Sequence, residues 1–192
     1  MTIRGKFGFF YKGKYYICYN RFDSYPSGLG VELILEIIHA DLEEWIKLLE
    51  NIQEVSKDIK PTPEDIKKLE KYTDLSYGGS ATAWENLLRL TQGSFYHVLH
   101  SGYMINVNEK DVSEEYIYVL DLDNKEFRAE GVYSHDIDVT SSLEIEELVK
   151  LAIEWSKGEL DEDYDPEKEL IEMQEISKWR LEEFKNSLCY KD

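Results

Sequence analysis

The sequence predicts an α+β domain in which an N-terminal β-hairpin and an antiparallel meander pack with about six helices. Two aromatic-rich runs, at residues 5–11 and 14–19, flank a Lys-Gly pair at residues 12–13, which is a hairpin pattern with glycine available for the turn. Apolar residues at helical spacing follow over residues 29–93, and strand-like runs return over residues 103–133.

Four helices are expected between residues 29 and 93. The first begins at Leu29 and is almost wholly apolar, which is typical of a buried helix. Asp41 is placed to cap the second helix. Thr62, followed by proline and then by an acid at the third helical position, starts the third helix, and Trp84 with two leucines marks the fourth.

Three strands are expected in the second half of the chain. They cover residues 103–107, 116–122 and 126–133, each rich in aromatic or β-branched residues. The polar residues 123–125 make a tight connection between the last two strands, which therefore pair as neighbours.

Two further helices are expected toward the C-terminus. Ser141 or Ser142 can cap a helix that runs to Lys157, where a glycine follows as a stop signal. No linker rich in proline, glycine or serine and no internal repeat divides the chain. Residues 1–192 are therefore predicted to form a single α+β domain, with a C-terminal helix from about residue 166.

The composition is that of a folded cytoplasmic protein. Hydrophobic residues make up 42% of the 192 residues, enough for a packed core. No apolar run approaches the ~18 residues needed to cross a bilayer, and no signal-peptide pattern opens the chain, so no membrane partner is expected. Cys18 and Cys189 are far apart and form no CxxC pattern, which favours a reducing compartment.

The net charge of −18 argues against direct binding to a nucleic-acid backbone, which requires clustered bases. The charge is uneven, because residues 1–21 hold five of the 22 bases and no acid. In residues 22–192, 17 bases stand against 40 acids, a net charge of −23. A basic segment on an acidic body can steer a small anion to that segment. The alternative is a solvated acidic surface that keeps the protein soluble.

The connection between the hairpin and the first helix, YNRFDSYPSGLG at residues 19–30, is the one stretch that hints at a site. Pro26 and two glycines restrict the turn, and the helix start that follows is a natural anion site. The alternative is an ordinary strand-to-helix turn in which Asp23 or Ser27 caps the helix.

Asp23 is expected to hold this loop together. An Asp before Ser-Tyr-Pro suits an Asx-type turn, so its carboxylate should accept backbone N–H groups between Tyr25 and Gly28 and pair with Arg4 or Arg21. Positive φ is expected at one of the loop glycines, residues 28 and 30.

Two stretches resemble a family of small uncharacterised proteins of phages, large viruses and fungi. The first is an R-G pair, then F-x-x-x-G-K, then Y-N-x-x-D-S-Y-P-S-G-x-G, and it is similar to the D-[GS]-Y-P-x-G-x-G loop that follows the N-terminal hairpin of that family. The second is EYIYVLDLD at residues 115–123. The match covers about 40 residues and implies no established activity. It points to Arg4, Asn20, Asp23, Tyr25, Pro26, Gly28 and Gly30.

A second likeness is to N-terminal-nucleophile hydrolases of the bile-salt-hydrolase type, which place Arg, Asn and Asp together after a hairpin. This resemblance implies Thr2 as nucleophile, with Asn20, Arg21 and Asp23 around the scissile amide. The mechanism needs Thr2 as the first residue, so that its own amine can act as base. The printed chain begins at Met1, which counts against this activity unless Met1 is removed.

Other constellations have ordinary structural interpretations, so no metal and no cofactor is expected. Three alternating acids at residues 161–165 have the spacing of a calcium loop, but Pro166 stands where that loop demands glycine. His97 and His100 lack a third ligand at zinc-like spacing. Asp121 and Asp123 resemble paired carboxylates, but Asp123 lies in a predicted turn, where Asp is common.

These observations favour a non-enzymatic acidic binding protein, of the accessory or anti-defence kind that viruses carry, engaging a host protein in the host cytoplasm. The alternatives are the amide hydrolase and a nucleotide- or phosphate-binding module that uses the 23–30 loop. Whether the protein is an enzyme stays open. The expected ligand- or partner-binding residues are Arg4, Asn20, Arg21, Asp23, Tyr25, Ser27, Gly28 and Gly30.

Overall fold

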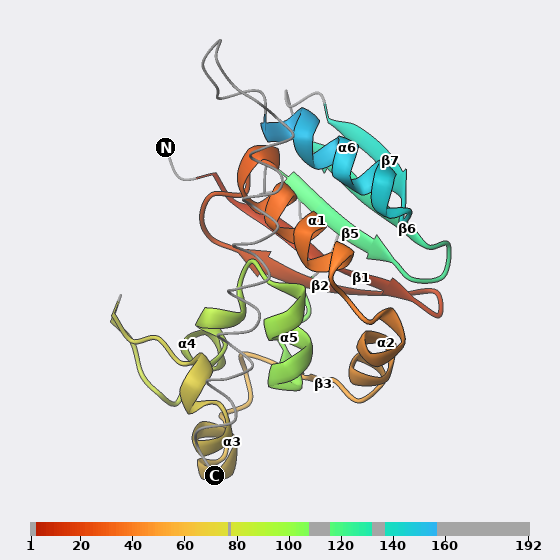
Figure 1. Cartoon of the computed structure of the whole chain (residues 1–192). Coiled ribbons are helices and arrows are strands. Elements are labelled where there is room, and N and C mark those ends of the chain that lie inside the picture. The colour runs from red at the N-terminus through yellow and green to blue at the C-terminus, as the bar shows by residue number, and fades with distance from the viewer. Residues whose placement is uncertain (1–2, 77, 108–115, 132–136, 157–192) are drawn as a thin grey trace.

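The computed structural model describes residues 3–76, 78–107, 116–131 and 137–156, which form the predicted α+β fold (Figure 1). A five-stranded mixed sheet has the order β2-β1-β5-β6-β7. Its strands β1 and β5 are parallel, and the other neighbours are antiparallel. The strands are β1 Gly5–Tyr11, β2 Lys14–Asn20, β5 Tyr116–Asp121, β6 Glu126–Gly131 and β7 Asp138–Ser142.

The N-terminal hairpin is confirmed. Strands β1 and β2 pair from Gly5↔Asn20 to Tyr11↔Lys14, which leaves a two-residue turn. Both turn residues have positive φ, 51° at Lys12 and 71° at Gly13. Two positive φ values in succession define the turn that best matches the twist of paired strands.

Four helices line the apolar side of the sheet. They are α1 Val31–Ile38, α2 Leu42–Glu50, α5 Phe95–Ser101 and α6 Ile145–Ser156. Helices α1 and α6 lie side by side over one face of the sheet (Figure 1). The ring of Phe9 on β1 lies 4.9 Å from Phe95 and 6.4 Å from Trp45. These aromatic contacts join the sheet to α5 and α2 in one core.

A second apolar cluster lies beyond the edge of the sheet that β2 forms. It is built by α3 Pro63–Lys68, η2 Glu70–Tyr72, α4 Trp84–Leu87, η3 Arg89–Thr91 and the short strands β3 Gln53–Glu54 and β4 Tyr103–Met104. Its centre is the stacked pair of Trp84 and Tyr103, with ring centroids 5.6 Å apart. The η3 segment directly follows Leu88 of this cluster and lines the cavities described below.

The predicted N-caps of α2 and α3 are confirmed. The Asp41 carboxylate accepts the N–H groups of Glu43 and Glu44 at 3.0 and 3.1 Å. Thr62 and Asp65 form the capping box of α3. Both caps depend on residues within three positions of each other, so they are legible in the sequence.

Two boundaries differ from the predictions. Ser141 and Ser142 do not cap a helix, because they end strand β7, and α6 begins at Ile145. Strand β7 alternates exposed and half-buried residues and has one apolar side chain, so its sequence carries a weak strand signal. The strand predicted over residues 103–107 is regular only in β4, and Val107 instead donates to the Ile17 carbonyl oxygen on the outer edge of β2, at 2.9 Å.

Thr2, the acidic run at residues 161–165 and the C-terminal helix expected from about residue 166 lie outside the described residues. The prediction that residues 1–192 form a single domain therefore stays a prediction.

Candidate functional site

The loop after β2 is a rigid, internally bonded turn. Residues Pro26–Gly30 form one π-helical turn that runs directly into α1. Asn20 is buried, and its side-chain amide donates to the Phe22 carbonyl oxygen at 2.5 Å and to the Ser24 hydroxyl at 2.8 Å. The carbonyl oxygen of Ser24 in turn accepts the Tyr118 hydroxyl of β5 at 2.9 Å. The amide of Asn20 is therefore committed to holding the loop.

Asp23 holds the loop through its main chain, so the predicted role of its carboxylate is wrong. Its φ is +50°, a conformation that Asp tolerates better than most residues. Its backbone carbonyl oxygen accepts the N–H group of Leu29 at 3.1 Å. Within the described part of the chain, the Asp23 carboxylate makes no hydrogen bond and no ion pair with Arg4 or Arg21.

The loop glycines are required by close approach, and the predicted positive φ at residue 28 or 30 is wrong. A Cβ on Gly28 would lie 2.8 Å from the Asp23 carbonyl oxygen. A Cβ on Gly30 would lie 2.6 Å from Cζ3 of Trp155, where α6 packs on the turn. Both positions are thus sterically closed to a side chain.

A cavity of about 350 Å³ opens between this loop and η3, and we call it the acidic cavity. It carries three carboxylates, Asp23, Glu32 and Asp74, against one base, Arg89. Its lining residues are Asn20, Phe22, Asp23, Gly28, Leu29, Glu32, Asp74, Arg89, Leu90, Gln92 and Gly93.

Exposed apolar side chains gather at this cavity. Phe22 is 41% exposed and Leu90 is 47% exposed, and both line it. Leu75, 44% exposed, directly follows the lining residue Asp74. Among the described residues only Ile59 and Ile145 are large, apolar and comparably exposed. We call the side chains of Phe22, Leu75 and Leu90 the apolar rim.

A second cavity, of about 500 Å³, lies where the open end of the hairpin meets η3 and residues 104–107, and we call it the basic cavity. Five bases and one acid line it, and the acid, Glu85, forms an ion pair with Lys57. The charged lining residues are Arg4, Lys6, Arg21, Lys57, Glu85 and Arg89. Arg89 and Gln92 stand between the two cavities and line both.

The basic N-terminal segment is divided by the hairpin. At the turn, Lys12 Nζ lies 2.7 Å from Glu50 and Lys14 forms an ion pair with Glu54, and both pairs are exposed. At the open end, Arg4, Lys6 and Arg21 face the basic cavity. The hairpin thus separates surface ion pairs from cavity-lining bases that are close in sequence.

The predicted site residues therefore fall into three groups. Asn20, Asp23 and Gly28 line the acidic cavity, whereas Arg4 and Arg21 line the basic cavity. Tyr25, Ser27 and Gly30 line neither and serve the turn or the packing of α6. The sequence did not indicate Asp74, Lys57 or Arg89, which come from segments far along the chain and carry no local motif.

Cys18, His97 and His100 are the described Cys and His side chains in or near the cavities whose chemistry the structure defines. Burial raises the pKa of the Cys18 thiol to about 12, so it stays protonated at neutral pH. Nδ1 of His97 forms a hydrogen bond with the Leu90 carbonyl oxygen at 3.1 Å, and Nδ1 of His100 forms one with the Tyr96 carbonyl oxygen at 3.0 Å. Within the described ranges, no group of three His, Cys, Asp or Glu residues is arranged to hold a metal ion.

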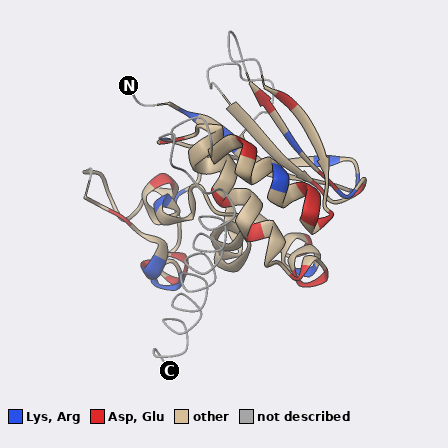
Figure 2. Ribbon diagram, turned by 45° about the horizontal axis from the view of Figure 1, so that its top comes forward, with Lys and Arg blue, Asp and Glu red and all other residues tan. Residues whose placement is uncertain are grey.

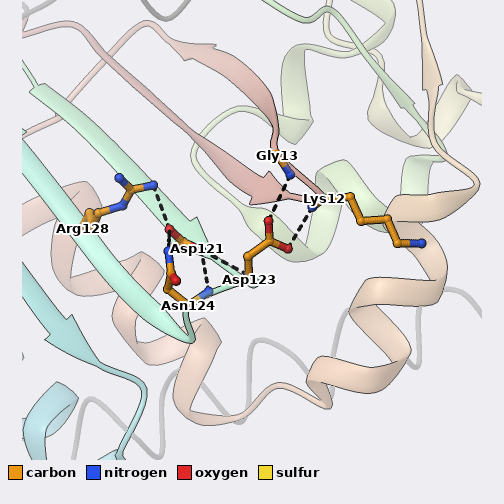
Figure 3. A network of polar contacts seen from close by, with 6 residues as sticks. All are labelled: Lys12, Gly13, Asp121, Asp123, Asn124 and Arg128. Atoms are coloured by element: carbon orange, nitrogen blue, oxygen red, sulfur yellow. Dashed lines mark hydrogen bonds and ion pairs between the residues drawn. The ribbon is translucent and has the colours of Figure 1, made fainter.

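Asp123 joins the β5–β6 turn to the hairpin turn, and Asp121 holds the β5–β6 turn and Arg128 (Figure 3). The Asp123 carboxylate accepts the backbone N–H groups of Lys12 and Gly13 at 2.8 and 3.0 Å. Asp121 is buried, lies 3.0 Å from Nη2 of Arg128 and accepts the Asn124 N–H at 2.8 Å. These bonds commit both carboxylates to the fold.

The two stretches that carry the family resemblance are neighbours in space. Strand β5 pairs with β1, so Tyr118 reaches the loop at Ser24 and Asp123 reaches the hairpin turn. The two stretches therefore belong to one connected structural unit.

Within the described ranges, no helix has the length and apolar character needed to span a membrane. No protein-family model, curated protein or solved structure matches the chain. The resemblance to phage, virus and fungal proteins stays a prediction.

Proposed function

We propose that the protein is a non-enzymatic binding protein that docks a basic, apolar segment of a partner protein on the acidic cavity and its apolar rim. One observation carries this proposal. Of the five large apolar side chains that are well exposed among the described residues, Phe22 and Leu90 line a cavity that carries three carboxylates, and Leu75 directly follows the lining residue Asp74.

The chemistry of this surface selects the partner. Aromatic and large aliphatic side chains supply most of the energy at protein interfaces when the partner covers them. The carboxylates of Asp23, Glu32 and Asp74 favour Lys or Arg beside that apolar contact and disfavour acidic segments. A cavity of about 350 Å³ suits one or two anchoring side chains.

The rigidity of the loop supports binding. Phe22 and Asp23 stand on a turn that Asn20, Ser24 and Tyr118 hold by hydrogen bonds of 2.5–2.9 Å. Little ordering is therefore needed when a partner binds, and preorganisation of this kind raises affinity. The resemblance to virus-associated proteins makes a host protein the partner class that we propose.

The test uses fluorescent 12-residue peptides in which Leu or Phe alternates with Lys or Arg. Two matched peptides replace the bases with Glu or the apolar residues with Ser. We expect the parent peptide to bind at least tenfold more tightly than either, by about 1.4 kcal/mol. Equal binding of all three peptides would refute the proposed chemistry.

Two pairs of variants locate the surface. Phe22→Ala should weaken the parent peptide about tenfold, whereas Ile145→Ala, at an exposed apolar residue on α6, should not. Asp23→Asn with Asp74→Asn should weaken it more than Glu43→Gln with Glu44→Gln, which removes the same charge from α2. Equal effects within each pair would mean that the peptide binds the acidic body at large.

A further inference from the structure

We propose that the basic cavity is a second binding site, which takes a nucleotide carrying two or three phosphate groups. The proposal does not rest on the function proposed for the docking surface, and the two sites share only Arg89 and Gln92 in their linings. It moves the expected anion site from the 23–30 loop to the open end of the hairpin.

The charge of the cavity is opposite to that of the protein. Five bases and one acid line it, a local charge of +4 in a chain of net charge −18. Lys6 is only 1% exposed, so solvent screens its charge less than that of a surface base. A polyanion fits a lining of this charge, and several bases can contact separate phosphates.

The cavity is assembled by several elements, which sets it apart from a surface patch. Arg4 directly precedes β1, Lys6 lies at the start of β1, and Arg21 directly follows β2. Arg89 comes from η3, and its Nη2 donates to the Asn86 side chain at 3.0 Å, which fixes its position. Convergent bases held by separate elements define a concave site.

The other lining residues form a surface on which the nucleobase of a nucleotide can pack. Leu88, Met104, Ile105 and Val107 supply an apolar wall. Tyr19 stands beside Lys6 as its cross-strand neighbour, so an aromatic ring and an ammonium share one side of the hairpin. A volume of about 500 Å³ lies within the range of sites for small organic ligands. A nucleotide has both parts that this lining suits. Its phosphates can contact the Lys and Arg side chains, and its nucleobase can pack on the apolar wall.

The charge outside the cavity limits the size of the ligand. Acidic residues are spread over helices and strands alike (Figure 2). A long nucleic acid would have to cross this acidic surface, which repels phosphates, whereas a mononucleotide contacts only the cavity.

Isothermal titration calorimetry tests the ligand class with ATP, ADP, AMP, adenosine and inorganic tripolyphosphate, in EDTA. We expect affinity to rise from adenosine to ATP and to fall between 50 and 500 mM NaCl, because salt screens the phosphate contacts. ATP should also bind more tightly than tripolyphosphate. No binding of any phosphorylated probe at 1 mM overturns the site, and equal binding of ATP and tripolyphosphate overturns the nucleotide assignment.

Variants test the location. Arg4→Gln and Arg21→Gln should each weaken ATP about tenfold, and Glu85→Gln should tighten it, because it removes the one acid in the lining. Lys47→Gln, on the exposed side of α2, is the matched control and should bind as the wild type does. Leu75→Ala, on the apolar rim and outside the lining of the basic cavity, should also leave ATP binding unchanged, which separates this site from the docking surface.

A measurement on the wild-type protein supports the variants. Addition of ATP should shift the amide resonances of Tyr19, Thr91 and Ile105, which line the cavity, and leave those of α2 in place. Shifts confined to other regions, or Arg variants that are folded by circular dichroism and bind ATP as tightly as the wild type, would overturn the location.

Discussion

Asp23 and Gly28 meet through the main chain, and this contact shows how a loop can select residues for steric reasons alone. The positive φ of Asp23 turns its carbonyl oxygen toward the start of the helix, where it accepts the Leu29 N–H and leaves no room for a side chain at Gly28. The Asp23 carboxylate stays at the edge of the acidic cavity. One residue thus has a structural main chain and a side chain that is available for binding.

Gly28→Ala and Gly30→Ala should each lower the free energy of unfolding by about 1–3 kcal/mol, because the new methyl group meets atoms closer than 3.0 Å. The two costs should respond differently to Trp155→Ala. That background should reduce the cost of Gly30→Ala, whose clash is with the indole, and leave the cost of Gly28→Ala unchanged. Urea unfolding of the wild type, the three single variants and the two double variants measures this, and equal reductions would contradict the assigned contacts.

At the scale of elements, the turn between β5 and β6 supports the turn between β1 and β2. Strands β1 and β5 are parallel, so both lead toward the same end of the sheet. Asp123 then accepts two backbone N–H groups of the hairpin turn, which the strand ladder leaves unsatisfied. This contact fastens the hairpin at the end away from the cavities and helps to keep its open end in place.

Asp123→Ala should lower the free energy of unfolding by about 1–2 kcal/mol, through loss of two hydrogen bonds to a carboxylate. Amide hydrogen exchange at Lys12 and Gly13 should become faster. The control is Asp138→Ala at an exposed position on β7, which should change stability by less than about 0.5 kcal/mol. Unchanged exchange at both turn amides would show that the carboxylate does not protect them.

At the scale of the whole molecule, a half-buried carboxylate couples helix packing to pH. Glu36 of α1 accepts the Ser94 hydroxyl at 2.5 Å and the Tyr96 N–H at 3.1 Å, at the start of α5. Burial raises the pKa of Glu36 to about 7, although these hydrogen bonds oppose the shift, and the nearby Glu32 adds to it. The folded protein therefore binds a proton on Glu36 more tightly than the unfolded chain does.

The raised pKa of Glu36 should contribute to the free energy of unfolding in full below about pH 4.5. This contribution should decline as the pH rises through 7, by up to about 3 kcal/mol. The comparison is with Glu36→Gln, which keeps the shape and does not titrate. The unfolding free energy of the wild type minus that of Glu36→Gln should fall from pH 5 to pH 8. Parallel pH profiles for the two proteins would contradict a raised pKa.

Features that depend on neighbours along the chain could be predicted from the residues alone. The hairpin follows from aromatic runs around Lys12-Gly13, and the caps of α2 and α3 follow from Asp41 and Thr62 with their next few residues. The α+β class follows from the change in periodicity after residue 102. In each case the deciding contact spans a few residues, so its chemistry is visible in the local pattern.

How these parts meet depends on contacts between distant segments, which no local pattern predicts. The hydrogen bond from Tyr118 to Ser24 spans 94 positions, and the contact from Asp123 to Lys12 spans 111. Residues predicted as one site line two cavities of opposite charge, because Asp74 and Arg89 arrive from distant segments. Side chains brought together by folding leave no spacing pattern in the chain, since their proximity depends on strand order and helix packing.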